Sequence, residues 1–144
     1  MIREITQNDF KGLLALYMQL HENLMPEQTD EIMNLWNRIV NDKDYHIIVA
    51  EENGQILSSC TCVIIPNLTH NQQPYAFIEN VITDVNHRNK GLATQCLDFA
   101  KEIAVKENCY KLMLLTGSKK ESTLNFYRKA GYNSEDKTAF IQWI

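Results

Sequence analysis

A strand that leads through a polar loop into a helix constrains this chain more than any other feature. Residues 81–94 read VITDVNHRNKGLAT, with β-branched residues first and a helix start that contains Gly91 and Ala93. A helix N-terminus has four backbone N–H groups without internal partners and the positive end of the helix dipole, so it can hold a phosphate. Arg88 and Lys90 add positive charge there. The segment alone leaves two interpretations open: a phosphate site, or a glycine that only eases the turn.

Other phosphate and nucleic-acid sites fit the sequence poorly. It contains neither the G-x-G-x-x-G pattern of dinucleotide-binding folds nor the G-x-x-x-x-G-K-[ST] pattern of P-loop proteins. The formal net charge is −4 at pH 7, whereas a nonspecific nucleic-acid binder normally has a strong basic excess. We therefore expect no nucleic acid among the partners.

The spacing of apolar residues predicts a mixed α/β fold. The expected order is β, α, α, β, β, β, α, β, α, β, with a further short strand after Gly131, which is the expected C-cap of the last helix. Asn53 and Gly54 predict the tight turn of a hairpin. Capping boxes are expected at 6–9 and 118–121. The expected helices start near residues 10, 32, 92 and 118, and the strands after the first span 45–50, 55–65, 75–85, 111–116 and 138–143.

Length and composition predict a single cytoplasmic domain. With 144 residues and 44% hydrophobic content, residues 1–144 suit one domain with a buried core. The sequence begins MIREIT, without an apolar run for a signal peptide or membrane span, so we expect a cytoplasmic protein with no membrane partner. The four cysteines form no C-x-x-C pair, and we expect buried, reduced thiols rather than metal ligands. They are Cys60, Cys62, Cys96 and Cys109.

Two motifs in the second half of the chain resemble those of the GNAT N-acetyltransferases. RNKGLA at 88–93 matches the [RQ]-x-x-G-x-[GA] pyrophosphate loop of that family, and NFYRKAGY at 125–132 resembles its N-x-x-[FY]-Y-x-K-x-G-F region in shortened form. Both occur in the family's order and spacing. The resemblance implies the GNAT fold, an α/β fold with a mixed sheet of six to seven strands and about four helices. Two of its parallel strands splay apart to form the cleft for CoA.

The resemblance also implies that acetyl-CoA binds as the cosubstrate. No metal site is expected, because the histidines are scattered along the sequence. The first splayed strand, 77–85, is expected to pair its backbone with the pantetheine arm, and the second is expected at 111–116. Asn125 is expected to hydrogen-bond the pantetheine or its own surroundings in the helix. The expected cofactor-binding residues are Val81, Ile82 and Thr83 on the strand, Arg88, Asn89, Lys90, Gly91, Leu92, Ala93 and Thr94 in the loop and helix start, and Asn125.

Two residues are candidates for the chemistry. Acetyl transfer to an amine requires a neutral amine and a proton for the departing thiolate. Glu79 corresponds to a carboxylate that serves as general base in several branches of the family, and the alternative is an anchor for a cationic substrate. Tyr127 corresponds to the phenol that donates to the sulfur of CoA, and the alternative is a core aromatic. His87 lies in the pyrophosphate loop, whereas the remaining histidines are expected to be ordinary surface or hairpin residues: His21, His46 and His70.

The acceptor amine is less constrained. IENV at 78–81 and CYKL at 109–112 are similar to the glucosamine-6-phosphate N-acetyltransferase branch, which favours an amino sugar or a similar small amine. Asn80 and Thr116 stand where that branch tends to have acids, so peptide amines also stay open. A homodimer is compatible with the sequence. Two other functions stay open: a noncatalytic acyl-CoA-binding or sensing domain of the same fold, and an interaction module without a ligand.

Overall fold

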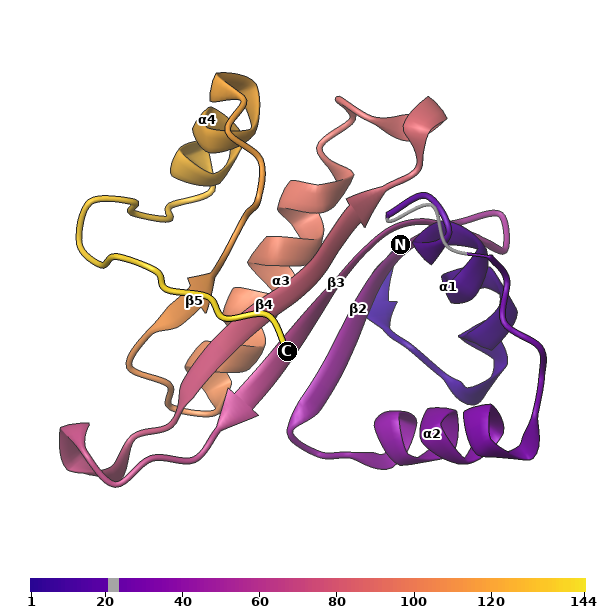
Figure 1. Cartoon of the computed structure of the whole chain (residues 1–144), viewed down its shortest axis with the longest axis horizontal. Coiled ribbons are helices and arrows are strands. Elements are labelled where there is room, and N and C mark those ends of the chain that lie inside the picture. Colours follow the sequence, from indigo (N-terminus) through magenta and orange to yellow (C-terminus); the bar gives the residue numbers. More distant parts are fainter. Residues whose placement is uncertain (21–23) are drawn as a thin grey trace.

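The computed structural model describes residues 1–20 and 24–144, and their centre is a five-stranded mixed sheet (Figure 1). His21 lies outside the described residues. The strands follow one another across the sheet in chain order, with antiparallel pairing throughout except between the last two, which are parallel. They are β1 (Ile2–Glu4), β2 (Tyr45–Glu52), β3 (Gln55–Ile65), β4 (Tyr75–Thr83) and β5 (Leu112–Leu114).

The described residues also form four α-helices and three short 3-10 turns, and the last helix follows the last strand. The helices are α1 (Phe10–Tyr17), α2 (Asp30–Asn41), α3 (Leu92–Lys106) and α4 (Glu121–Lys129), and the turns are η1 (Gln7–Asp9), η2 (His70–Gln72) and η3 (Val85–His87). The prediction of a mixed α/β fold with about four helices is confirmed. Within residues 1–20 and 24–144, no helix is both long and apolar enough to cross a membrane.

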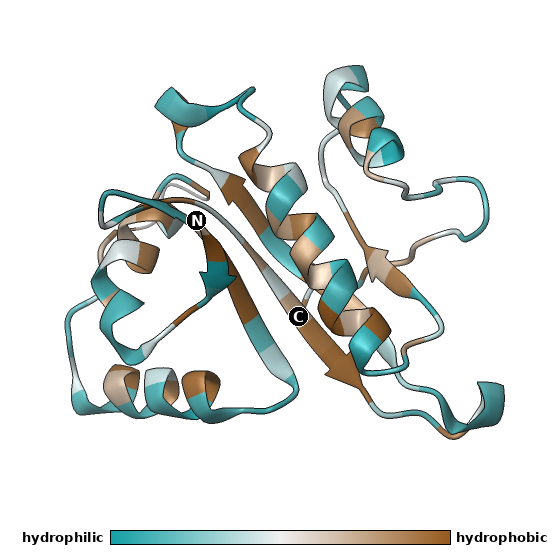
Figure 2. Cartoon of the chain, turned by 180° about the vertical axis from the view of Figure 1, so that it is seen from behind, coloured by the Kyte–Doolittle hydropathy of each residue, from teal (hydrophilic) through white to brown (hydrophobic). Residues whose placement is uncertain are grey.

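Each face of the sheet has its own core because strand side chains alternate between faces. Figure 2 shows α3 lying across one face, where it packs on residues such as Ile48, Cys60 and Ile78. α1 and α2 pack on the other face, around Phe10 and Trp36. The prediction of buried, reduced cysteines is confirmed for three of them, and the fourth is free but half-buried: Cys60, Cys62 and Cys96, against Cys109.

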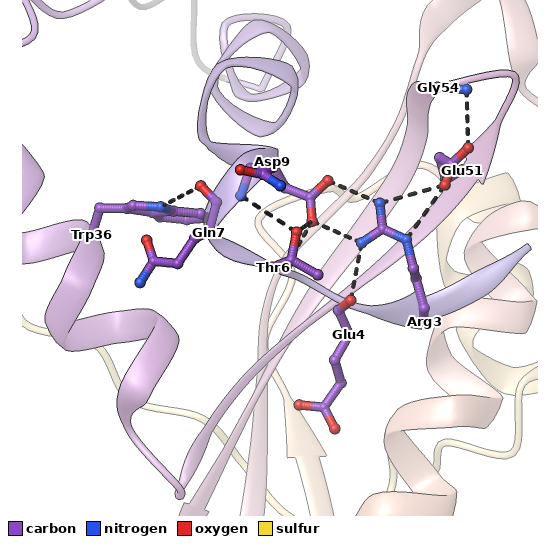
Figure 3. Close-up of polar contacts among 9 residues, drawn as sticks. Arg3, Glu4, Thr6, Gln7, Asp9, Trp36, Glu51 and Gly54 are labelled. Atoms are coloured by element: carbon purple, nitrogen blue, oxygen red, sulfur yellow. Dashed lines mark hydrogen bonds and ion pairs between the residues drawn. The ribbon is translucent and has the colours of Figure 1, made fainter.

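Arg3 joins β1 to the segment that starts α1. Its guanidinium forms a fork with Asp9 at 2.7 and 2.8 Å, and its Nε donates to Glu51 of β2 at 3.4 Å (Figure 3). The predicted capping box is present, because Thr6 Oγ1 accepts from the backbone N–H of Asn8 and Asp9 accepts from the backbone N–H of Thr6. These bonds fix where α1 lies against the sheet.

Two predictions about the end of the chain are wrong. Residues 138–143 form no strand, and no short strand follows Gly131, so the described sheet has five strands rather than six or seven. Residues 133–144 are exposed and pair with no strand in the described part of the chain. Residues 138–143 therefore form no strand despite their strand-forming composition. The capping box at 118–121 is also wrong: α4 has Lys120 as N-cap, and Ser118 Oγ instead accepts from the Lys120 N–H in a local turn.

Candidate active site

β4 and β5 separate halfway along β4. They pair at three positions, the last of which is Ile78 with Leu114. β4 continues to Thr83 and remains paired with β3 on its other side. Within the described residues, no strand covers the β5-facing edge of β4 from Glu79 onward. This open edge contains the residues predicted to bind pantetheine: Val81, Ile82 and Thr83.

A β-bulge lies where the two strands separate. The pairing of β3 with β4 shifts between Thr61–Glu79 and Ser59–Ile82, which leaves one extra residue in β4. Asn80 has a φ of 52°, in the left-handed region that asparagine tolerates better than most residues. Because a bulge bends its strand and increases the local twist, it helps β4 to diverge from β5. Asparagine at position 80 therefore suits this backbone.

The chain enters α3 through Gly91, whose φ is 76°. Gln95 donates the first helical hydrogen bond, to the carbonyl of Gly91 at 3.0 Å. The three preceding N–H groups, those of Leu92, Ala93 and Thr94, have no acceptor among the residues that the structure describes, and Gly91 offers no capping side chain. Since these N–H groups lie at the positive end of a helix dipole, this helix start is suited to an anion.

The polar loop that precedes α3 carries two exposed cations, Arg88 and Lys90. Nε of Arg88 lies 3.5 Å from the carbonyl oxygen of Thr83, which places its side chain beside the end of β4. Asn89 has a φ of 62°, so the loop turns sharply between the two cations. The predicted pyrophosphate residues, 88–94, thus occupy one continuous turn between the open edge of β4 and α3.

A polar link between α1 and this loop was missed by the sequence analysis. Nε2 of Gln19 donates to Oδ2 of Asp84 at 2.9 Å, and the backbone N–H of Val85 donates to Oε1 of Gln19 at 3.0 Å. Oδ1 of Asp84 also lies 2.7 Å from Nδ1 of His87. The hydrogen bond from Gln19, followed by that from His87, lowers the pKa of Asp84 to about 2. An aspartate just after a strand signals a local turn, but no signal identifies a partner 65 residues away.

Tyr127 is held by the end of α4. The N–H groups of Gly131 and Tyr132 donate to the carbonyls of Arg128 and Tyr127, both at 3.0 Å, which is a Schellman ending with Gly131 at φ 94°. The predicted role of Gly131 at the helix end is therefore confirmed. This turn sets the ring of Tyr132 edge-on to Tyr127, with centroids 6.2 Å apart. Tyr127 also packs against the core on the α3 face of the sheet.

The phenol of Tyr127 remains protonated over a wide pH range. Burial raises its pKa, and the nearby Cys60 and Glu79 raise it further. A neutral phenol is able to donate a proton or a hydrogen bond. The ring of Tyr127 belongs to the core, and the role of its hydroxyl toward CoA stays a prediction.

Glu79 is exposed at the start of the open edge. It lies opposite Thr61 in the ladder, and therefore on the sheet face that α1 and α2 cover. In the described part of the chain its carboxylate makes no hydrogen bond or ion pair, so no partner holds it in place. Glu79 is the first residue of β4 beyond its last pair with β5, and it contributes to the raised pKa of Tyr127.

Three buried hydroxyls lie on the same face as Glu79, and no sequence pattern indicated them. They belong to Tyr17 at the end of α1 and to Ser59 and Thr61 on β3. Burial raises the pKa of Tyr17, and the neighbouring hydroxyls of Thr61 and Ser59 offset part of this effect. No hydrogen bond of good geometry satisfies any of the three within the described residues. Buried hydroxyls without a hydrogen-bond partner are unusual, because buried polar groups are normally paired.

The remaining predicted residues are more dispersed. Oδ1 of Asn125 accepts from Arg128 at 2.9 Å on the exposed side of α4, the second of its two predicted roles. His46 pairs with Glu4 at 2.9 Å, and His70 stacks on Tyr110 with ring centroids 4.0 Å apart. The described residues include no group of three or more His, Cys, Asp or Glu arranged to hold a metal ion.

Comparison with known proteins identifies the family. The sequence profile of the acetyltransferase (GNAT) family matches residues 10–132. A putative acetyltransferase from Agrobacterium tumefaciens str. C58 has 34% sequence identity and a TM-score of 0.90, over 99% of both chains. Glucosamine-6-phosphate N-acetyltransferase from Arabidopsis thaliana has 24% identity and a TM-score of 0.84, over 100% of this chain and 98% of that one; at this identity the likeness shows the fold.

A relative from Trypanosoma brucei brucei, glucosamine 6-phosphate N-acetyltransferase, is 29% identical over 91 residues, which are 63% of this chain and 60% of that protein. The chain covers 60% and 64% of the length of two curated relatives that it matches. The match of the family profile covers most of the chain and includes both motifs that carry the resemblance. The chain belongs to the acetyltransferase (GNAT) family.

Proposed function

We propose that this protein transfers the acetyl group of acetyl-CoA to a primary amine of a small-molecule or peptide acceptor. One observation carries the proposal: the open edge of β4 leads, through a loop with two cations, to the free N–H groups at the start of α3. A ligand with an extended amide-containing arm and a pyrophosphate matches this sequence of groups. Family membership supplies the identity of such a ligand, since GNAT proteins use acetyl-CoA.

The residues fit the two halves of acetyl-CoA in different ways. The backbone of Val81, Ile82 and Thr83 would pair with the pantetheine arm as a missing strand would. The N–H groups of residues 92–94 would bind the pyrophosphate, with Arg88 and Lys90 adding charge. Asn89 and Gly91 shape the turn through their positive φ angles. Asn125 has the weakest support, because its side chain accepts from Arg128.

The chemistry requires a proton acceptor and a proton donor on the two sides of the reacting atoms. Acetyl-CoA would supply an activated thioester, which a neutral amine attacks directly. Glu79 would take the proton of the amine, directly or through a water, and its exposed position at the point where the strands separate supports this role. Tyr127 would supply the proton to sulfur, and its raised pKa, which keeps Oη protonated, supports this role.

An amino sugar is the first acceptor to test. The IENV and CYKL segments and the relative from Trypanosoma brucei brucei both favour it. The acceptor would approach Glu79 from the sheet face that α1 and α2 cover. A peptide acceptor would use the same acetyl-CoA site and would differ from an amino sugar only in its contacts on this face.

The test is an amine panel with and without acetyl-CoA. Acetyl-CoA binding is measured by calorimetry, and release of free CoA thiol is followed with amino sugars, peptides, polyamines and aminoglycosides. Binding together with turnover on at least one amine supports the proposal. Binding without turnover on any amine favours a noncatalytic acyl-CoA sensor, and absence of binding removes the acetyl-CoA site itself.

A further inference from the structure

The three buried hydroxyls on the sheet face that α1 and α2 cover form one connected group. Ser59 and Thr61 of β3 are fully buried, and the hydroxyl of Tyr17 at the end of α1 is buried as well. The hydroxyls of Thr61 and Ser59 both lie close enough to Tyr17 to offset part of the rise that burial causes in its pKa. Oη of Tyr17 is therefore a neighbour of both strand hydroxyls.

This group has one more hydrogen-bond donor than it can use internally. Each hydroxyl has one O–H donor and can accept from another, so Ser59 can donate to Tyr17 and Tyr17 to Thr61. The O–H of Thr61 is then left without an acceptor, and a buried donor that stays unpaired is costly. The ladder partner of Ser59 is Ile82, which has no polar side-chain atom, so an outside acceptor is available only at the Thr61 end of this ladder.

The acceptor next to Thr61 is the carboxylate of Glu79. Thr61 and Glu79 are directly opposite one another in the β3–β4 ladder, so their side chains lie on the same face with Cβ atoms about 5 Å apart. A glutamate side chain can span this separation by changing its rotamer. The carboxylate of Glu79 is exposed and has no hydrogen bond or ion pair within residues 1–20 and 24–144, so nothing in that part of the chain opposes such a change.

We propose that Thr61 is a positioning residue for acetyl transfer, whose hydroxyl donates to one oxygen of the Glu79 carboxylate, with Tyr17 and Ser59 supporting it from behind. The second carboxylate oxygen is then directed at the acceptor amine. This inference rests on the proposed function, because it needs Glu79 to act as the base.

The bond from Thr61 is compatible with both protonation states of Glu79. Before the reaction the ionised carboxylate accepts at both oxygens. When the free oxygen takes the proton of the amine, the other oxygen still accepts from Thr61, and the proton stays on Glu79. Thr61 therefore restricts the carboxylate to one orientation throughout the step and exchanges no proton itself, which is how a fixed geometry favours catalysis.

The first test is Thr61→Val, assayed with the amine that the panel identifies as best. Valine replaces the hydroxyl with a methyl group of similar size, so kcat should fall about tenfold while the KM for acetyl-CoA stays unchanged. Thr61→Ser keeps the hydroxyl and should recover most of the lost turnover. Stabilisation of both variants by acetyl-CoA, measured as a shift in melting temperature, shows that the fold is intact. Turnover of Thr61→Val equal to that of the parent would overturn the proposal.

A double-mutant cycle with Glu79→Gln separates positioning from packing. If Thr61 acts through the carboxylate, Thr61→Val should cause no further loss of kcat once Glu79→Gln has removed the base. A full tenfold loss on top of Glu79→Gln would mean that Thr61 acts through packing, which would overturn the proposal. Parent-like turnover of Glu79→Gln alone would overturn the base role itself and this inference with it, whereas an impaired Glu79→Gln beside an active Thr61→Val would overturn only the inference.

Tyr17→Phe tests the supporting hydroxyl without changing either strand. It removes the donor to Thr61 and should lower kcat by about threefold, with a loss that also disappears in the Glu79→Gln background. Tyr132→Phe is the matched control, because its hydroxyl is also buried without a hydrogen bond in the described part of the chain but belongs to the core on the α3 face. Equal turnover in Tyr17→Phe and Tyr132→Phe would contradict the supporting role of Tyr17.

Discussion

Gln19 and Asp84 connect α1 to the start of the predicted pyrophosphate loop through two hydrogen bonds in opposite directions. Nε2 of Gln19 donates to Asp84 at 2.9 Å while Oε1 of Gln19 accepts from the N–H of Val85 at 3.0 Å. A single amide side chain thus fixes both the carboxylate that ends β4 and the backbone that follows it. The start of the loop is therefore held by the turn that follows α1.

Replacing Gln19 with leucine should weaken acetyl-CoA binding by about tenfold, because a hydrogen bond to a charged group is lost and the loop start is released. Titration calorimetry measures the affinity. Gln28→Leu, at an exposed glutamine before α2, serves as the matched control and should bind like the parent. If both variants bind alike, the link has no role in positioning the loop.

Gly91→Glu should abolish acetyl-CoA binding, because it places a negative side chain at the anion-binding start of α3. Gly91→Ala separates this effect from backbone strain: φ at this position is +76°, and an added Cβ would come no closer than 3.9 Å to the nearest side-chain atom. Alanine should lower the melting temperature of the free protein but still show stabilisation by acetyl-CoA, whereas glutamate should show none. Equal stabilisation of the glutamate variant and the parent would contradict the phosphate assignment.

Tyr127→Phe removes one hydroxyl and keeps the ring in the core. Turnover should fall by roughly 10²-fold with little change in acetyl-CoA affinity, because only the proton donor is lost. Tyr132→Phe is the control, since its hydroxyl is also buried and forms no hydrogen bond within the described residues. Steady-state kinetics and calorimetry on both variants distinguish the roles. Unchanged turnover in Tyr127→Phe would make Tyr127 a core aromatic only.

Glu79→Gln should lower the rate most at pH values below the pKa of the acceptor amine and less above it. At low pH most of the amine carries a proton that a base must remove, whereas at high pH the solution supplies free amine. Profiles of kcat and KM against pH for both proteins provide the measurement. An increase confined to KM would identify Glu79 as an anchor for a cationic substrate, and an equal loss at every pH would exclude the base role.

Asp9→Asn should destabilise the protein at neutral pH and make its free energy of unfolding less dependent on pH in the acidic range. The hydrogen bond from Arg3 lowers the pKa of Asp9 from 3.8 to about 2, so the ionised form stabilises the native state above pH 4 and this stabilisation is lost as pH falls toward 2. The shift corresponds to about 2 kcal/mol at pH 7. Urea unfolding at pH 7 and at lower pH should show a difference from the parent that shrinks with acid. Asp136→Asn, at an exposed position, should match the parent throughout.

The sequence alone determined those features whose cause lies within a few residues. The alternation of apolar residues, the Asn53–Gly54 turn, the Thr6–Asp9 capping box and the ending of α4 at Gly131 depend on local backbone preferences, and the structure has all of them. The two motifs at 88–93 and 125–132 indicated the family for the same reason, because each is a short turn or helix end of fixed geometry.

The tertiary structure alone decided the features that depend on a distant partner. The bulge at Asn80 and the last β4–β5 pair, Ile78–Leu114, depend on how β3, β4 and β5 pair with one another. Together they determine which part of β4 lacks a neighbouring strand. The bond from Gln19 to Asp84 joins residues that are 65 positions apart. Residues 138–144 show the same principle in reverse: they have strand composition but form no strand, because the free energy of a strand comes from the neighbour with which it pairs.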